Sequence, residues 1–222
     1  MKTKVISYYC DVDSNDTYYS DHANKFIENM NELDIPFYVE HIISLGSYRN
    51  NCLFKPKFIK KCLEKFDTSL IWLDIDSRVH DDIDIVDSSD HDLIFATNSK
   101  NEYGKFIPKA SPIFMKNNEN VKNFVDKWIE KCEHYLQTSN KFFDHEILLE
   151  VLAENNLNIG LVGMPFCAFA GMNFPDFKPI ITMGISSGES KVQGLIDMGS
   201  DPERVKMEAI RKTYYTHNGI IK

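Results

Sequence analysis

Short apolar runs alternate with amphipathic segments along the first hundred residues, and this alternation restricts the fold more than any other feature. Four runs are rich in β-branched, aromatic and other apolar side chains, as buried strands are: residues 5–10, 37–43, 69–73 and 93–97. Residues 21–33 and 56–66 between them carry apolar side chains at helical spacing. The resulting strand–helix–strand–helix–strand order predicts an α/β fold with a mostly parallel sheet flanked by helices.

The second half of the chain continues the alternation. We predict further strands at residues 112–115 and within residues 157–167, and a polar loop over residues 46–54. Helical spacing or start signals predict three more helices, at residues 119–136, 144–155 and 201–214. No repeat or linker interrupts the pattern, so we expect a single domain over residues 1–222.

Charge and cysteine usage exclude several classes of protein. The chain has 25 basic and 33 acidic residues, and its net charge of −8 argues against a nucleic-acid partner. No run resembles a signal peptide or a membrane span. The five cysteines form no CxxC pair, which favours a reducing compartment. These features predict a soluble, cytoplasmic protein.

Acidic pairs are the most informative polar motif, because ligands of open α/β sheets gather outside the carboxyl ends of the strands. Asp-x-Asp occurs four times, at residues 11–13, 74–76, 82–84 and 90–92. The pair at 90–92 precedes its strand and therefore lies at the wrong end. The pair at 82–84 alternates with isoleucines, which predicts an exposed edge strand. Only the pairs at 11–13 and 74–76 directly follow buried strands.

Asp74 and Asp76 end the most strand-like run of the chain. Two carboxylates at such a position can hold Mg²⁺ or Mn²⁺, because these hard cations prefer oxygen ligands and share them with phosphate. The alternative is that the pair solvates a strand-to-loop turn, and a short motif alone leaves both interpretations open. We expect the Asp76 carboxylate to be exposed in the loop, where it would contribute little to folding.

Part of the chain resembles nucleotide-sugar glycosyltransferases of the Rossmann-like GT-A fold. The resemblance is carried by residues 54–59, the predicted helix that they begin, and residues 70–76. Those enzymes have a similar Lys-Pro helix that leads into an apolar strand ending in a metal-binding Asp-x-Asp. Later segments resemble the same family in the same order, so that the resemblance covers roughly residues 1–165: residues 93–96, 111–117, 125–129 and 144–148.

The resemblance implies a metal-dependent enzyme that transfers a sugar from a nucleoside diphosphate, most often UDP, to a saccharide or other hydroxyl acceptor. The cofactor would be Mn²⁺ or Mg²⁺. Residues 1–100 would form the nucleotide-binding half, and residues 101–222 the acceptor half and the C-terminal tail. The oligomeric state, the sugar and the stereochemical outcome stay open.

The resemblance also implies roles for individual residues. Asp144 and His145 would be catalytic or acceptor-facing, and Asp74 and Asp76 would bind the metal. The donor would be held by Tyr9, Asp11, Arg49, Lys55, Asp74, Ile75 and Ser111. Ordinary structural roles compete with these: a core tyrosine, helix-capping aspartates at 11 and 144, and solvated cations at 49 and 55.

The chain departs from the family at one position. Many members supply a third metal ligand as a His in the C-terminal region, but Met183 stands at the nearest equivalent here. A thioether is a poor ligand for Mg²⁺ or Mn²⁺. Either His217 completes the metal site, or water does, or the tail has diverged. Gly184 to Gly188 with Lys191 could still wrap the diphosphate.

Two other hypotheses stay open. A phosphohydrolase of the haloacid-dehalogenase type would use Asp11 as nucleophile and Asp13 as general acid, with Asp197 and Asp201 as later acidic residues. A catalytically inactive domain could instead bind a nucleotide-sugar without turning it over.

Overall fold

The centre of the molecule is a six-stranded sheet. The computed structural model describes residues 3–11, 17–85, 87–100, 103–169 and 177–184. In spatial order the strands are β2 (Phe37–His41), β1 (Lys4–Tyr9), β3 (Leu70–Trp72), β6 (Ile113–Met115), β5 (Leu93–Ala96) and β7 (Ile159–Val162). β6 is antiparallel to both of its neighbours, and the other pairings are parallel. The predicted mostly parallel sheet is therefore confirmed.

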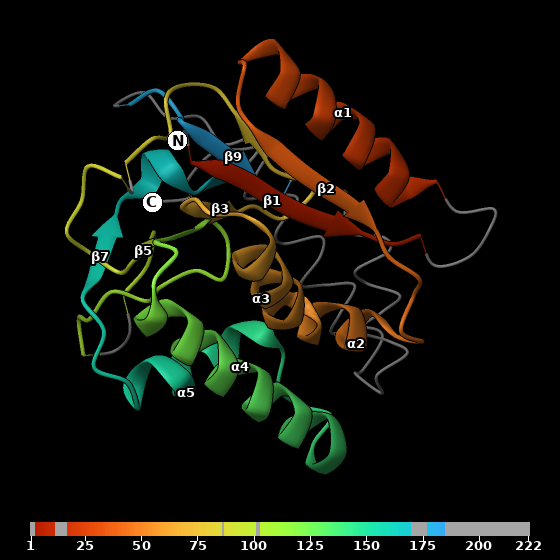
Figure 1. The fold of residues 1–222 in the computed structure, drawn as a ribbon, viewed down its shortest axis with the longest axis vertical. Coiled ribbons are helices and arrows are strands. Elements are labelled where there is room, and N and C mark those ends of the chain that lie inside the picture. Colours follow the sequence, from red (N-terminus) through yellow and green to blue (C-terminus); the bar gives the residue numbers. More distant parts are fainter. Residues whose placement is uncertain (1–2, 12–16, 86, 101–102, 170–176, 185–222) are drawn as a thin grey trace.

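Helices cover both faces of this sheet (Figure 1). One face carries α2 (Tyr48–Leu53), α3 (Lys55–Lys65), α4 (Glu119–Thr138) and α5 (Asp144–Ala153). The other face carries α1 (Tyr18–Glu32). Successive side chains of a strand point to opposite faces, so Leu70 and Trp72 of β3 join the α3–α5 core and Ile71 joins the α1 core. Burial on both faces explains why this segment is so apolar.

A small second sheet extends the α1 face. It consists of β4 (Arg78–Val79), β9 (Ile181–Met183) and β8 (Ala168–Phe169), and the short 3-10 helix η1 (Met164–Phe166) leads into β8. The antiparallel pairing of β4 with β9 brings residues about 100 positions apart in the sequence together immediately after Asp76. The sequence did not predict this sheet, because its strands have only two or three residues and lack a readable periodicity.

Two local predictions are wrong. Residues 46–54, predicted as a loop, contain α2, and the Ser47 side chain caps this helix by accepting a hydrogen bond from the Asn50 N–H. Residues 82–84, predicted as an edge strand, form no strand. There the Asp82 carboxylate accepts the N–H of Asp84, which is a local turn contact that competes with strand pairing.

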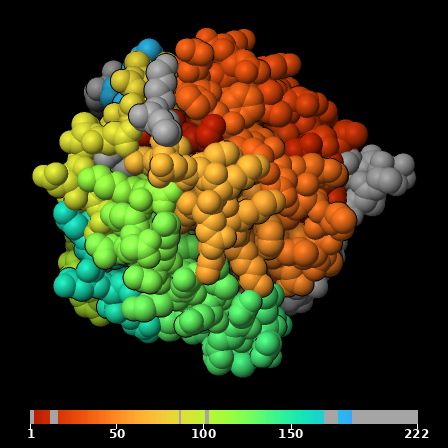
Figure 2. All heavy atoms as spheres, viewed as in Figure 1, coloured from red at the N-terminus to blue at the C-terminus, as the bar shows by residue number. Residues whose placement is uncertain are grey.

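The α3 segment lies between the N-terminal strands and α4 on the face shown in Figure 2. Trp72 and Trp128 are buried in the core beneath this face, as predicted. Within the described part of the chain, no helix combines the length and the apolar character needed to cross a bilayer. The helix predicted at 201–214 lies outside the described residues.

Candidate functional site

Side chains from four elements meet at the edge of the large sheet where β3 ends. Asp74 and Asp76 follow β3, and Ser111 reaches the same edge because it precedes the antiparallel β6. Lys55 at the start of α3 and Asp144 at the start of α5 complete the group. We call Lys55, Asp74, Asp76, Ser111 and Asp144 the carboxylate edge. Open α/β sheets bind ligands at this kind of edge.

Asp74 is held by three neighbours. Its Oδ1 atom accepts a hydrogen bond from the indole Nε1 of Trp72 at 3.0 Å and lies 3.2 Å from the Lys55 ammonium. Its backbone N–H donates to the Ser111 hydroxyl at 2.9 Å. The side chain is still 39% exposed, so it is oriented by the protein and accessible to a ligand. A carboxylate that is both held in place and accessible is better suited to bind a metal or the donor than a carboxylate that moves freely in a solvated turn.

Asp76 is buried, at 4% exposure, so the expectation of an exposed loop carboxylate is wrong for this residue. Tyr19 of α1 and Arg78 of β4 lie close to it. Burial raises the pKa of Tyr19, and the charge of Asp76 raises it further. Burial lowers the pKa of Arg78, and Asp76 opposes that effect. Ile75, between the two aspartates, is buried in the α1 core.

Lys55 is buried between two carboxylates. Its Nζ atom lies 2.5 Å from Asp144 Oδ2 and 3.2 Å from Asp74 Oδ1, and donates to the carbonyl of Ala110 at 3.1 Å. Burial by itself would lower the pKa of this lysine, but the charges of Asp144 and Asp74 outweigh it and hold the pKa above its ordinary value. Lys55 therefore carries its charge inside the site.

Asp144 and His145 begin α5 and point to different partners. Asp144 is buried and paired with Lys55. The Nε2 atom of His145 lies 2.8 Å from the carbonyl of Pro108, and because a carbonyl only accepts, this nitrogen carries the hydrogen. His145 thus anchors the loop that leads into β6, beside the carboxylate edge.

Arg49 does not face the carboxylate edge with its donor groups. Its Nε atom donates to the carbonyl of Phe142 at 2.9 Å and its Nη2 atom to that of Tyr135 at 2.8 Å. The residue is buried, and burial lowers its pKa. These bonds join α2 to α4 and to the connection between α4 and α5, whereas the resemblance implied a contact with the donor.

Asp11 and Tyr9 lie at the end of β1. One Asp11 oxygen accepts the N–H groups of Tyr19 and Ser20 at 3.0 and 2.9 Å, and the other accepts the Ser20 hydroxyl. Asp11 therefore caps α1, which is the structural alternative weighed from the sequence. Tyr9 is half-buried, and its ring stacks on His41 with 4.9 Å between centroids.

The sequence prediction missed a group of tyrosines near the carboxylate edge. Burial raises the pKa of Tyr8, Tyr19 and Tyr48, and the charge of Asp144 adds to this for Tyr8 and Tyr48. The Tyr8 hydroxyl donates to the carbonyl of Asn51 at 2.5 Å. Tyr8 is part of strand β1. The alternation of side chains along a strand indicates which face Tyr8 occupies, but it does not indicate which residues lie next to it.

Only two carboxylates of the predicted metal site lie in the described residues. That part of the chain contains no group of three or more His, Cys, Asp or Glu side chains placed to hold a metal ion. The pair Asp74 and Asp76 nevertheless fits Mg²⁺ or Mn²⁺, because these ions are commonly held by one or two carboxylates together with substrate phosphates and water. His217, Asp13 and the segment 185–191 lie outside the described residues.

Met183, which stands where a His was expected, is the last residue of β9. The register of β9 on β4 pairs Thr182 with Arg78 and Ile181 with Val79. A thioether at residue 183 is a poor ligand for Mg²⁺ or Mn²⁺.

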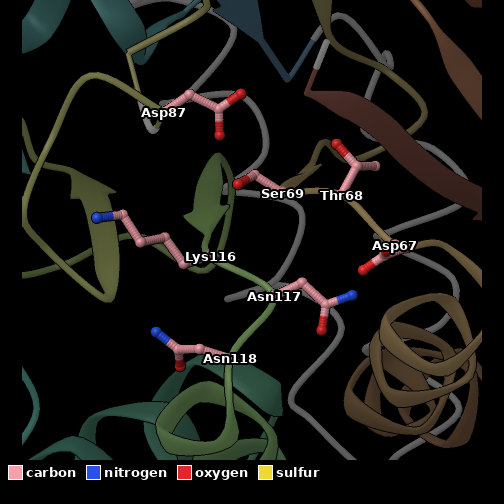
Figure 3. A pocket seen from close by; sticks show the side chains of 7 residues that line it. All are labelled: Asp67, Thr68, Ser69, Asp87, Lys116, Asn117 and Asn118. Carbon is pink, nitrogen blue, oxygen red and sulfur yellow. The ribbon is translucent and has the colours of Figure 1, made fainter. Parts of the chain in front are cut away.

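A polar pocket of about 310 Å³ lies elsewhere, at the opposite end of β3 (Figure 3). Asn117 in its wall donates to the carbonyls of Leu63 and Phe66, and Asn118 caps α4. These contacts close the ends of two helices. The pocket contains none of the predicted site residues, and its wall consists of Asp67, Thr68, Ser69, Asp87, Lys116, Asn117 and Asn118.

Comparisons with known proteins support the fold. No protein-family profile and no curated protein matches the sequence. A similar solved structure is that of a glycosyltransferase involved in the glycosylation of the major capsid of PBCV-1, with a TM-score of 0.62 and 12% identity over 93% of this chain and 100% of that one. At this identity the likeness shows a shared fold alone.

Proposed function

We propose that the chain is a metal-dependent glycosyltransferase of the GT-A type. It would transfer a sugar from a nucleoside diphosphate, with UDP favoured, to a hydroxyl group of a saccharide or another acceptor. The fold shared with a glycosyltransferase supports this proposal. The observation that carries it is the position of Asp74 and Asp76 directly after β3, where Asp74 contacts the Lys55–Asp144 pair.

Asp74 and Asp76 would hold Mn²⁺ or Mg²⁺. When bound, the ion would offset the negative charge that develops on the diphosphate leaving group. The carboxylates of Asp74 and Asp144 lie around the single Lys55 ammonium, and two negative charges against one positive charge favour a further cation there. Water or His217 would complete the coordination.

The remaining residues divide between donor and acceptor. Tyr9, Ile75 and Ser111 lie at or beside the strand ends and are proposed to contact the donor through ring, backbone and hydroxyl groups. Asp144 would face the acceptor hydroxyl, either by accepting its proton or by holding a neighbouring hydroxyl. His145 would fix the loop that borders this position.

The direct test is release of nucleoside diphosphate. The protein is incubated with UDP- and GDP-sugars, with and without Mn²⁺, and with simple saccharide acceptors. We expect metal-dependent release with one donor, and loss of that release in Asp76→Asn. Nucleotide binding without turnover would support the inactive binding domain instead. Hydrolysis of phosphate esters that is lost in Asp11→Asn would support the phosphohydrolase.

A further inference from the structure

Three oxygens of the protein surround the Lys55 ammonium, as many as it has hydrogens. A lysine ammonium has three N–H donors and no acceptor. Three oxygens already lie within 3.2 Å of Nζ: one each from Asp144, Asp74 and the Ala110 carbonyl. The side chain is also 93% buried. A phosphate could reach this ammonium only by displacing one of the three partners.

The surroundings of Lys55 fix its position further. The ammonium lies 5.2 Å from the ring centroid of Trp72, which is a cation–π contact. The same indole donates its Nε1–H to Asp74 Oδ1, the oxygen that Lys55 also contacts. Trp72 and Lys55 thus hold one oxygen of Asp74 from two sides.

Lys55 is also the link between two parts of the proposed site. Asp74 follows β3 on the donor side, and Asp144 begins α5 on the acceptor side. Their carboxylates repel each other at short range, and because Asp144 is buried, this pair of like charges needs a counter-charge. The Lys55 ammonium supplies that charge at 3.2 Å from one carboxylate and 2.5 Å from the other.

We propose that Lys55 is a positioning residue that holds Asp144 in place against Asp74, rather than a ligand of the donor diphosphate. This inference rests on the proposed function. The buried ammonium of Lys55 would fix the distance between Asp74 at the proposed metal site and Asp144 at the proposed acceptor site. Asp144 is then oriented before the acceptor binds, which favours the reactive geometry over other arrangements.

Lys55→Met separates the two roles. If Lys55 positions Asp144, kcat for transfer to the acceptor falls about 100-fold, while the Kd of the nucleoside diphosphate with Mn²⁺ changes less than about 3-fold. Lys55→Arg keeps the charge and restores part of kcat. The matched control is Lys57→Met on the same helix, because Lys57 is exposed and pairs with Glu133 at 2.8 Å; it leaves both values unchanged.

A double-mutant cycle tests whether Lys55 acts through Asp144. In the Asp144→Asn background, Lys55→Met should lower kcat less than about 3-fold, because the group that it positions is already altered. Losses that multiply would overturn the inference. A nucleotide Kd weakened 10-fold or more with kcat intact would also overturn it and restore Lys55 as a donor ligand.

A readout independent of activity distinguishes this inference from the proposed function. Amide hydrogen exchange in the first turn of α5, residues 144–147, should quicken in Lys55→Met and stay unchanged in Lys57→Met. Unchanged exchange in both variants would overturn the positioning role. Quickened exchange in a protein that binds no nucleotide would instead contradict the proposed function and leave the Lys55–Asp144 link standing.

Discussion

At the scale of single residues, the type of a side chain and its place in the sequence indicate the chemistry available but not the partner. Asp74 reaches the predicted edge because it follows a buried strand. Arg49 and Lys55 are cations in the predicted segment as well, yet their partners are carbonyls and carboxylates of the protein. Both partners of Arg49, and the Asp144 partner of Lys55, lie more than 80 positions away in the sequence, so no local pattern could have identified them.

Arg49→Met should destabilise the protein without weakening nucleotide binding. The substitution leaves the carbonyls of Tyr135 and Phe142 without the donors that they have now, at a cost of about 2–3 kcal/mol. Urea unfolding measures this loss, and titration with UDP and Mn²⁺ measures the affinity. A stable variant that no longer binds UDP would return Arg49 to the donor site.

Asp76→Asn should lower transfer at least about 100-fold, because it removes the charge of a proposed metal ligand. Asparagine has nearly the same shape, so the fold is retained despite the burial of this position. Initial rates with Mn²⁺ and a circular dichroism spectrum test both statements. Full activity would contradict the assignment of Asp76 to the metal.

At the scale of elements, periodicity predicted the long helices and the buried strands, with ends that differ by a few residues from those observed. It failed for α2 and for the small sheet, because a six-residue helix spans fewer than two turns and strands of two or three residues span at most about one and a half periods, which is too short for a pattern to repeat. They are supported by contacts with distant segments, namely the bonds from Arg49 to the carbonyls of Tyr135 and Phe142 and the β4–β9 pairing.

The start of α1 provides a prediction about Asp11. Thr17 at the helix start makes no side-chain capping bond, and the Asp11 carboxylate accepts the N–H groups of Tyr19 and Ser20 instead. Asp11→Ala should therefore lower the free energy of unfolding by about 1–2 kcal/mol, and Asp11→Asn by less, because Asn also caps helices. Denaturant unfolding of both variants tests this. Equal losses in the two variants would contradict a capping role.

The contact between α4 and α5 provides a prediction about pH. The Lys131 ammonium, 2.5 Å from Glu150, and the Tyr135 hydroxyl, 2.8 Å from it, lower the pKa of this carboxyl. A lowered pKa in the folded state adds stability above the unfolded value of about 4.3, and this is lost as the pH falls through the folded value. Glu150→Gln should cost about 0.5 kcal/mol at pH 7.

The same substitution should cost less at pH 3, because this pH lies below the unfolded pKa of about 4.3, where the unfolded state takes up the proton and the advantage of the charged folded form shrinks. Urea unfolding of both proteins at the two pH values measures the difference. If the difference in free energy of unfolding between the two proteins stays constant or grows toward pH 3, the ion pair between α4 and α5 does not supply this stability.

At the scale of the whole molecule, the order of elements predicted the α/β sheet, and the structural likeness to a glycosyltransferase supports that architecture. The edge where a ligand would bind follows from the sheet direction, since strand ends are set by topology. The packing that orients the site, above all the buried Lys55 between Asp74 and Asp144, depends on contacts between distant segments and was not predictable from the sequence.

The central claim is that Asp74 and Asp76 form a metal-dependent nucleotide site. The most direct measurement is the melting temperature with UDP or GDP, each with and without Mn²⁺, in the unaltered protein and in Asp74→Asn. A ligand that binds only the folded state raises the melting temperature. We predict a rise that needs both one nucleotide and Mn²⁺ and that disappears in Asp74→Asn. No rise with either nucleotide, or a rise that persists without metal and in the variant, would contradict the claim.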